Sequence, residues 1–172
     1  AAVIFPLIIF SMGIFASVVG SFFVKLTGKN IMKAFYKGMI ATTVFCGVLF
    51  YLVTAGLMSE AGIGVLNLYL ALLVGVLVPG GMVVITEYYT GGQYGPVRTL
   101  SLASTPGHAT NIIAGLALSM RSTFWPIILI SSAVIVSFAL AGLYGIALAG
   151  VSMLSLAGIV VAIDAFGPIT DN

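Results

Sequence analysis

The sequence predicts an all-α integral membrane protein, and three observations lead to this class. Of its 172 residues, 61% are hydrophobic and only 6% are charged, whereas soluble domains carry about 25% charged residues. Five uncharged runs each have the roughly 20 residues that a helix needs to cross the hydrocarbon core of a bilayer. These runs are longer than the strands of a membrane β-barrel, and they do not alternate apolar with polar residues.

Five membrane-spanning helices are therefore expected, within a single membrane domain. Their predicted bounds are 1–24, 38–58, 63–86, 122–142 and 143–163. The last two runs meet at Ala141-Gly142-Leu143, so the turn that joins them must be tight. The chain begins without Met and stops just after Asp171, and we expect it to be a piece of a longer polypeptide.

The positions of the basic residues predict the orientation of the spans. The basic residues all fall in two of the connecting segments, 25–37 and 87–121, and are Lys25, Lys29, Lys33, Lys37, Arg98 and Arg121. The loops on the opposite side contain Glu60 as their only charged residue. Because Lys and Arg are enriched in cytoplasmic loops, segments 25–37 and 87–121 are predicted to be cytoplasmic, and the fifth span ends on that side.

The charge of the chain also limits its partners. A net charge of +2 gives no basic surface of the kind that nucleic acid requires, so no nucleic-acid partner is expected. The four lysines between the first two spans repeat every four residues. They are predicted to anchor that segment to anionic lipid headgroups of the bilayer.

Two carboxylates at the end of the fifth span are the strongest candidates for chemistry. Asp164 and Asp171 are seven residues apart, which places them on one face of a regular helix about 10 Å apart. Gly167-Pro168 is predicted to interrupt that helix, and Pro168 cannot donate to the carbonyl of Asp164. Carboxylates with a freed carbonyl suit a hard cation such as Mg²⁺. Alternatively, Asp171 lies in the wet headgroup zone and Asp164 is a structural hydrogen-bond partner.

The long connection 87–121 has two predicted parts. Its first half reads as a turn around Gly91-Gly92, and its second half, 109–120, is apolar enough to form a helix that continues into the fourth span. Thr110 is the predicted N-cap of this helix. Tyr88 and Tyr89 are typical of an interfacial aromatic belt, and Arg121 is interpreted as a flanking residue whose charge reaches the interface.

Small residues recur every four positions along the fifth span, at Ala141, Gly145 and Ala149. Such faces let helix backbones approach one another closely. The fifth span is therefore predicted to be surrounded by protein rather than by lipid.

The segment 162–172, AIDAFGPITDN, resembles a signature of the membrane-integral, ion-pumping inorganic pyrophosphatases. Two further segments resemble the same family in the same order: TEYYT at 86–90 with YGPV at 94–97, and ATNIIAGLA at 109–117. The resemblance implies a bundle of about sixteen helices, of which this chain supplies five, and a homodimer. It also implies hydrolysis of pyrophosphate on the cytoplasmic side, coupled to the pumping of H⁺ or Na⁺.

The resemblance assigns roles to the two carboxylates. Asp171 matches a ligand to the Mg²⁺ ions that hold pyrophosphate, and Asp164 matches a supporting aspartate one level deeper. The acidic clusters that would supply the remaining ligands are absent from the chain. We therefore expect no pyrophosphatase activity from this chain in isolation.

Two other functions remain open at this point. A secondary transporter would bind a cation or substrate near the middle of the bilayer, where this chain has few polar candidates, such as Asn67 and Ser137. A structural membrane subunit without chemistry would account for the small-residue faces.

Overall fold

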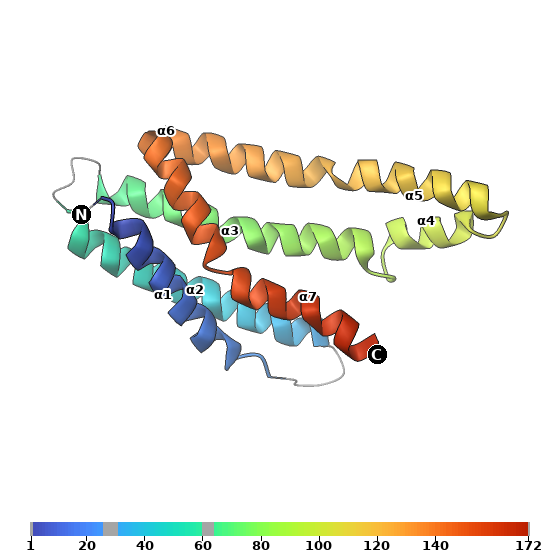
Figure 1. Ribbon diagram of the computed structural model, residues 1–172, viewed down its shortest axis with the longest axis horizontal. Coiled ribbons are helices and arrows are strands. Elements are labelled where there is room, and N and C mark those ends of the chain that lie inside the picture. Colours follow the sequence, from blue (N-terminus) through green and yellow to red (C-terminus); the bar gives the residue numbers. More distant parts are fainter. Residues whose placement is uncertain (1, 26–30, 60–63, 172) are drawn as a thin grey trace. The chain divides into compact units, whose positions relative to one another are not determined.

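The computed structural model describes residues 2–25, 31–59 and 64–171, without the side chains of residues 31, 163 and 166–171. Throughout these ranges the regular structure is helical and no strand is present, which confirms the all-α class (Figure 1). The helices are α1 (Phe5–Ser21), α2 (Ile31–Leu57), α3 (Val65–Thr90), α4 (Gly95–Ala103), α5 (His108–Ser122), α6 (Phe124–Leu154) and α7 (Ala157–Asp171). They form two compact units, one of residues 1–80 with 133–172 and one of residues 81–132.

Three helical segments of the described ranges are long and apolar enough to cross a membrane. They are Met32–Leu57, Val65–Ala103 and His108–Ala162. The third contains the fourth predicted span, 122–142, and all but the last residue of the fifth, 143–163. α1 is apolar but has only 17 residues, which makes it about 26 Å long against a hydrocarbon core of about 30 Å. These lengths and compositions are those of a membrane protein.

The predicted tight turn between the last two runs is confirmed. Helical geometry in α6 breaks at Ala141 (φ −147°, ψ 25°) and Gly142 (φ 61°, ψ −150°). The backbone conformation of Gly142 is one that essentially only glycine adopts. Three residues further on, a Cβ atom at Gly145 would collide with the carbonyl oxygen of Ser137. Glycine at these two positions therefore lets the chain reverse within two residues.

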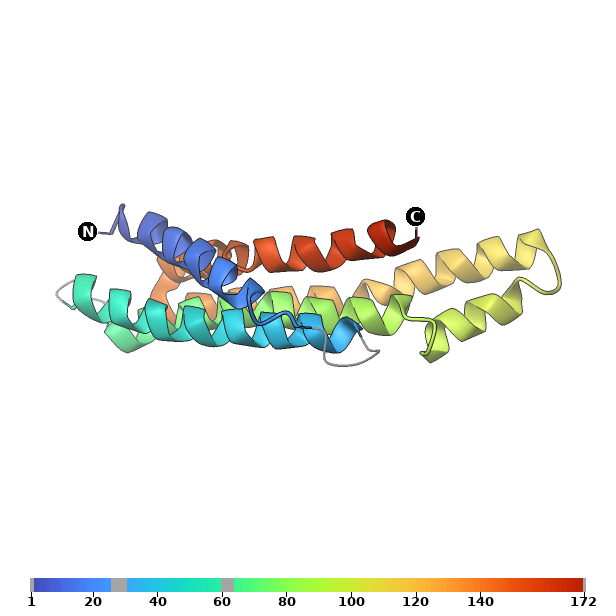
Figure 2. The same cartoon turned by 90° about the horizontal axis from the view of Figure 1, so that it is seen from below.

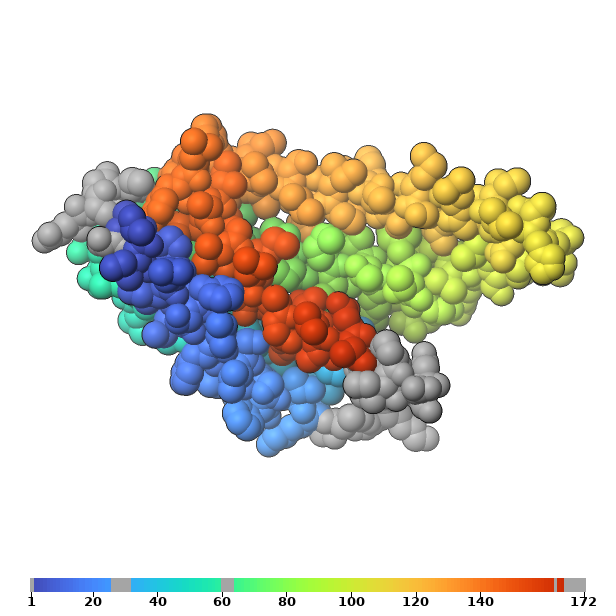
Figure 3. All heavy atoms as spheres, in the orientation of Figure 1, coloured from blue at the N-terminus to red at the C-terminus, as the bar shows by residue number. Residues whose placement is uncertain are grey.

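Close approaches between helices hold the larger unit together, at three glycines that have no room for a side chain. Gly20 of α1 lies against Thr42 of α2, Gly13 of α1 lies against Ser155, and Gly75 of α3 lies against the carbonyl of Ala149 and the hydroxyl of Ser152. Ser152 also donates a hydrogen bond of 2.8 Å to the carbonyl of Leu72. On the face drawn in Figure 3, the atoms of α1 and of the second half of α6 lie next to one another.

The second half of α6, from Leu143 to Leu154, packs against protein on one side, while Leu143 and Leu154 are exposed; that protein surrounds the whole fifth span stays a prediction. Gly145, Leu148 and Ser152 are buried along it. Near its start the hydroxyl of Tyr144 donates a hydrogen bond of 2.8 Å to the carbonyl of Ala2, 142 residues earlier in the sequence. α7 then continues the contact, because Gly158 lies 3.1 Å from the hydroxyl of Ser17, measured from an ideal Cβ position.

The smaller unit is built around a helical hairpin. α4 and α5 run side by side in antiparallel directions (Figures 1 and 2). The predicted helix in the second half of the long connection is confirmed as α5. It ends at Ser122, and α6 begins at Phe124, because Pro126 has no N–H to donate to the carbonyl of Ser122. Gly81 of α3 packs against Leu129 of α6, which brings the apolar ends of these two helices together.

The prediction that Thr110 caps α5 is wrong. The N-cap residue is Gly107 (φ 144°), which has no side chain with which to cap the helix. The hydroxyl of Thr110 instead donates to the carbonyls of Ala103, at 2.9 Å, and Gly107, at 2.8 Å. Thr110 thereby ties the end of α4 to the start of α5.

Candidate functional site

Both candidate carboxylates lie on α7, which the larger unit holds by its first turns. Leu156, just before α7, and Ile159 are buried, with 0% and 3% of their surface exposed. After them the helix leaves the core, and Val161 is 61% exposed. Asp164 is exposed as well, and it forms no hydrogen bond or ion pair with any residue in the described ranges. The described residues therefore leave the Asp164 carboxylate exposed.

Asp171 lies at the end of α7, and its side chain is outside the described part of the chain. The predicted interruption at Gly167-Pro168 is wrong, since α7 runs from Ala157 to Asp171. A proline removes only one hydrogen bond from a helix, and its fixed φ is compatible with helical geometry. The backbone therefore keeps Asp164 and Asp171 two turns apart on one helix.

The donor types at this site fit a hard divalent cation, but the described residues do not form a complete site. Carboxylate oxygens are ligands that Mg²⁺ prefers. Within the described ranges, no three His, Cys, Asp or Glu residues come together as a group that could hold a metal ion. A metal ion bound at this end of α7 would need ligands from beyond these ranges.

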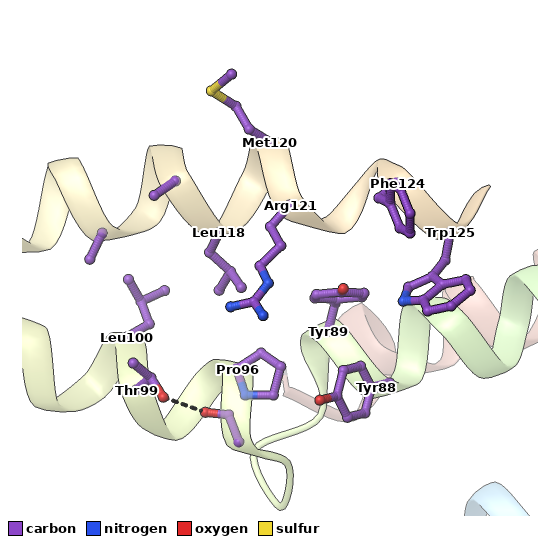
Figure 4. A pocket seen from close by; sticks show the side chains of 13 residues that line it. Tyr88, Tyr89, Pro96, Thr99, Leu100, Leu118, Met120, Arg121, Phe124 and Trp125 are labelled. Carbon is purple, nitrogen blue, oxygen red and sulfur yellow. Dashed lines mark hydrogen bonds between the residues drawn. The ribbon is translucent and has the colours of Figure 1, made fainter. Parts of the chain in front are cut away.

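A second feature, which sequence reasoning missed, is a cavity of about 1000 Å³ in the smaller unit. It lies where α3 ends, α4 begins and α5 passes into α6 (Figure 4). Its lining consists of Tyr88, Tyr89, Gly95, Pro96, Thr99, Leu100, Ala114, Ala117, Leu118, Met120, Arg121, Phe124 and Trp125. Arg121 is the only charged residue in this lining.

Aromatic rings line the cavity in two pairs. Tyr88 and Tyr89 have ring centroids 5.1 Å apart, and Phe124 and Trp125 have centroids 5.2 Å apart, both pairs edge to face. Sequence reasoning assigned the tyrosines to an aromatic belt and Arg121 to a helix flank, one at a time. The sequence did hold a signal for a shared cavity. Tyr88 and Tyr89 follow the end of one apolar run, Arg121 precedes the start of the next, and a helical hairpin brings these two ends together.

Comparison with known proteins shows which family this chain is similar to. The family model described as inorganic H⁺ pyrophosphatase matches residues 1–172. A protein of Rhizobium leguminosarum bv. trifolii named pyrophosphate-energized proton pump 2 is 45% identical over 100% of this chain and 84% of its own length. A protein of the same name from Mycoplana dimorpha is 43% identical over 99% of this chain and 86% of its own length.

A third relative is much longer than this chain. The K⁺-insensitive pyrophosphate-energized proton pump of Methanosarcina mazei is 41% identical over 99% of the chain. The chain spans only 26% of the length of that protein.

Proposed function

Because the chain belongs to the inorganic H⁺ pyrophosphatase family, we propose that it forms part of a membrane pump that hydrolyses pyrophosphate and moves H⁺ or Na⁺ across the bilayer. The observation that carries this proposal is the match of the family model to residues 1–172, the whole length of the chain. The apolar helices support it, since ion pumping requires a membrane-embedded protein.

The proposed pump is a multi-pass protein in which this chain supplies five spans of a bundle of about sixteen helices, and the pump works as a homodimer. The turn within α6 supports the count of five, because it divides one long helical segment into two arms. The one-sided distribution of the basic residues supports a cytoplasmic position for the connection 87–121 and for the end of α7.

The proposed active site lies on the cytoplasmic side, where Asp171 binds Mg²⁺ and Asp164 supports the site from deeper along α7. Bound Mg²⁺ neutralises the charge of pyrophosphate and orients the attacking water. Two features support these roles: the Asp164 carboxylate is exposed and pairs with none of the described residues, and an unbroken helix leads from it to Asp171. The remaining ligands come from other parts of the pump.

The family match favours the pump over the two alternatives, a secondary transporter and a structural subunit. Neither alternative requires pyrophosphate, so hydrolysis separates them from the pump. The test uses the full-length protein in inverted membrane vesicles, with phosphate release and ion uptake measured with and without Mg²⁺. The wild type is expected to do both only when Mg²⁺ and pyrophosphate are present.

Substitutions test the two carboxylates in the same vesicles. Asp171→Asn removes a metal-binding charge and is expected to abolish both hydrolysis and uptake. Asp164→Asn removes a supporting group and is expected to lower hydrolysis about 10- to 100-fold. Glu60→Gln, a carboxylate on the opposite predicted side, is the matched control and is expected to retain activity. A wild type that ignores pyrophosphate contradicts the function, whereas an active Asp171→Asn contradicts only the metal role.

A further inference from the structure

The cavity of the smaller unit combines one cation with aromatic and aliphatic walls. We infer that this cavity binds an anionic phospholipid of the cytoplasmic leaflet, with Arg121 holding the lipid phosphate. The site is distinct from the carboxylates of α7, since all of its lining residues lie between Tyr88 and Trp125. Its leaflet follows from the proposed orientation of the pump.

The depth of the cavity is that of the lipid headgroups. The apolar run of α3 ends at Thr86, and that of α6 begins at Phe124. Gly81 packs against Leu129, so these two runs leave the hydrocarbon at the same level. Tyrosine and tryptophan side chains, which line the cavity here, are enriched at the membrane–water interface.

The charge of the cavity favours an anion. Arg121 forms no ion pair or hydrogen bond with any residue that the structure describes, and no carboxylate is among the lining residues. Figure 4 shows its guanidinium group extending from α5 into the space between the helices, toward Tyr89 and Pro96. A guanidinium group can hold a phosphate through two parallel hydrogen bonds.

The walls favour a lipid over a free phosphate or pyrophosphate. Aliphatic side chains of Leu100 and Leu118 and the ring of Pro96 face the space around Arg121 (Figure 4). A small, highly charged anion would lose its hydration against these walls and gain a single cationic partner. A phospholipid places its phosphate on Arg121 and its acyl chains along the apolar walls.

The test measures the lipid that the full-length pump retains. The protein is purified from nanodiscs of equal parts phosphatidylglycerol and phosphatidylcholine, and native mass spectrometry counts the bound lipids. The wild type is expected to retain phosphatidylglycerol, and Arg121→Ala is expected to retain about tenfold less. Arg121→Lys keeps the charge without the paired hydrogen bonds and is expected to fall between them.

Arg98→Ala is the matched control. Arg98 is an exposed arginine of the same predicted cytoplasmic connection and is not part of the cavity lining, so its loss is expected to leave retention unchanged. Equal retention by wild type and Arg121→Ala overturns the proposal, as does displacement of the retained phosphatidylglycerol by pyrophosphate. Size-exclusion chromatography identifies misfolded variants. If Arg121→Ala is misfolded, the comparison of wild type with Arg121→Lys decides, and equal retention by these two proteins overturns the proposal. Lipid retention is measured without pyrophosphate hydrolysis. A negative result for lipid binding can therefore be told apart from a negative result for the pump function.

Discussion

Gly142 holds a backbone conformation in which a side chain is strained, and the substitution Gly142→Ala tests its role. At φ 61° and ψ −150°, a Cβ atom would raise the backbone energy by about 1–3 kcal/mol. We expect Gly142→Ala to lower the free energy of unfolding of the full-length protein by that amount. Thermal unfolding in detergent, followed by circular dichroism, measures the change.

Gly150 is the matched control for this residue. It lies in the same helix, its backbone is helical, and a Cβ atom there would meet no other atom within 4 Å. Gly150→Ala is expected to be neutral or to stabilise the helix by up to about 1 kcal/mol. Equal effects at both positions would show that the backbone conformation of Gly142 does not matter.

At this scale the sequence predicted the turn but not the individual hydrogen bonds. Two long apolar runs with only Ala141-Gly142 between them left no other place for the chain to reverse. The role of Thr110 was predicted wrongly, because a threonine near a helix start can be the N-cap or can lie in the first turn and donate its hydroxyl proton to a carbonyl. Which of these it does depends on the approach of α4 to α5, and that is a tertiary contact.

Among the helix pairs of the larger unit, α3 and α6 offer a sharp test of close packing, at Gly75. A Cβ atom at Gly75 would collide with the carbonyl of Ala149, which is backbone and cannot rotate away. Gly75→Ala is therefore expected to push the helices apart and to cost about 1–3 kcal/mol, as overpacking does in other cores. The measurement is the midpoint of thermal unfolding of the full-length protein.

Gly80 serves as the control in α3, since a Cβ atom there would meet nothing within 4 Å. Gly80→Ala is expected to leave the midpoint unchanged or to raise it. A second substitution, Ser152→Ala, removes the hydrogen bond to the carbonyl of Leu72 and is expected to cost about 0.6 kcal/mol, an average for such bonds in membranes. If Gly75→Ala is as stable as Gly80→Ala, α3 and α6 do not approach as closely as described.

Helices were predictable from apolar runs, but their ends were not. α3 continues to Thr90, beyond the charged Glu87, because leaving the hydrocarbon does not end a helix. α7 likewise passes through Gly167-Pro168. The cavity around Arg121 could not be read from periodicity, since it depends on the path of the hairpin between α4 and α5.

At the scale of the whole molecule, we expect this chain alone not to catalyse the hydrolysis of pyrophosphate. The described part contains no group of three potential metal ligands, and hydrolysis of pyrophosphate needs several Mg²⁺ ligands at once. The purified 172-residue chain is therefore expected to release no phosphate from pyrophosphate above background. The assay uses Mg²⁺ and lipid vesicles, and the full-length protein under the same conditions is the positive control. Mg²⁺-dependent hydrolysis by the short chain would refute this.

From the reversal at Ala141-Gly142 we expect a consequence for how the chain enters the bilayer during synthesis. In most membrane proteins, a hydrophilic loop joins a helix that runs outward to the next helix, which runs inward. This loop must cross the bilayer, and the translocation machinery supplies a water-filled path for it. Here the connection is two small uncharged residues, so no such loop exists. The predicted fourth and fifth spans, 122–142 and 143–163, are therefore expected to enter the bilayer together as a hairpin, once about forty residues of these two spans have left the ribosome.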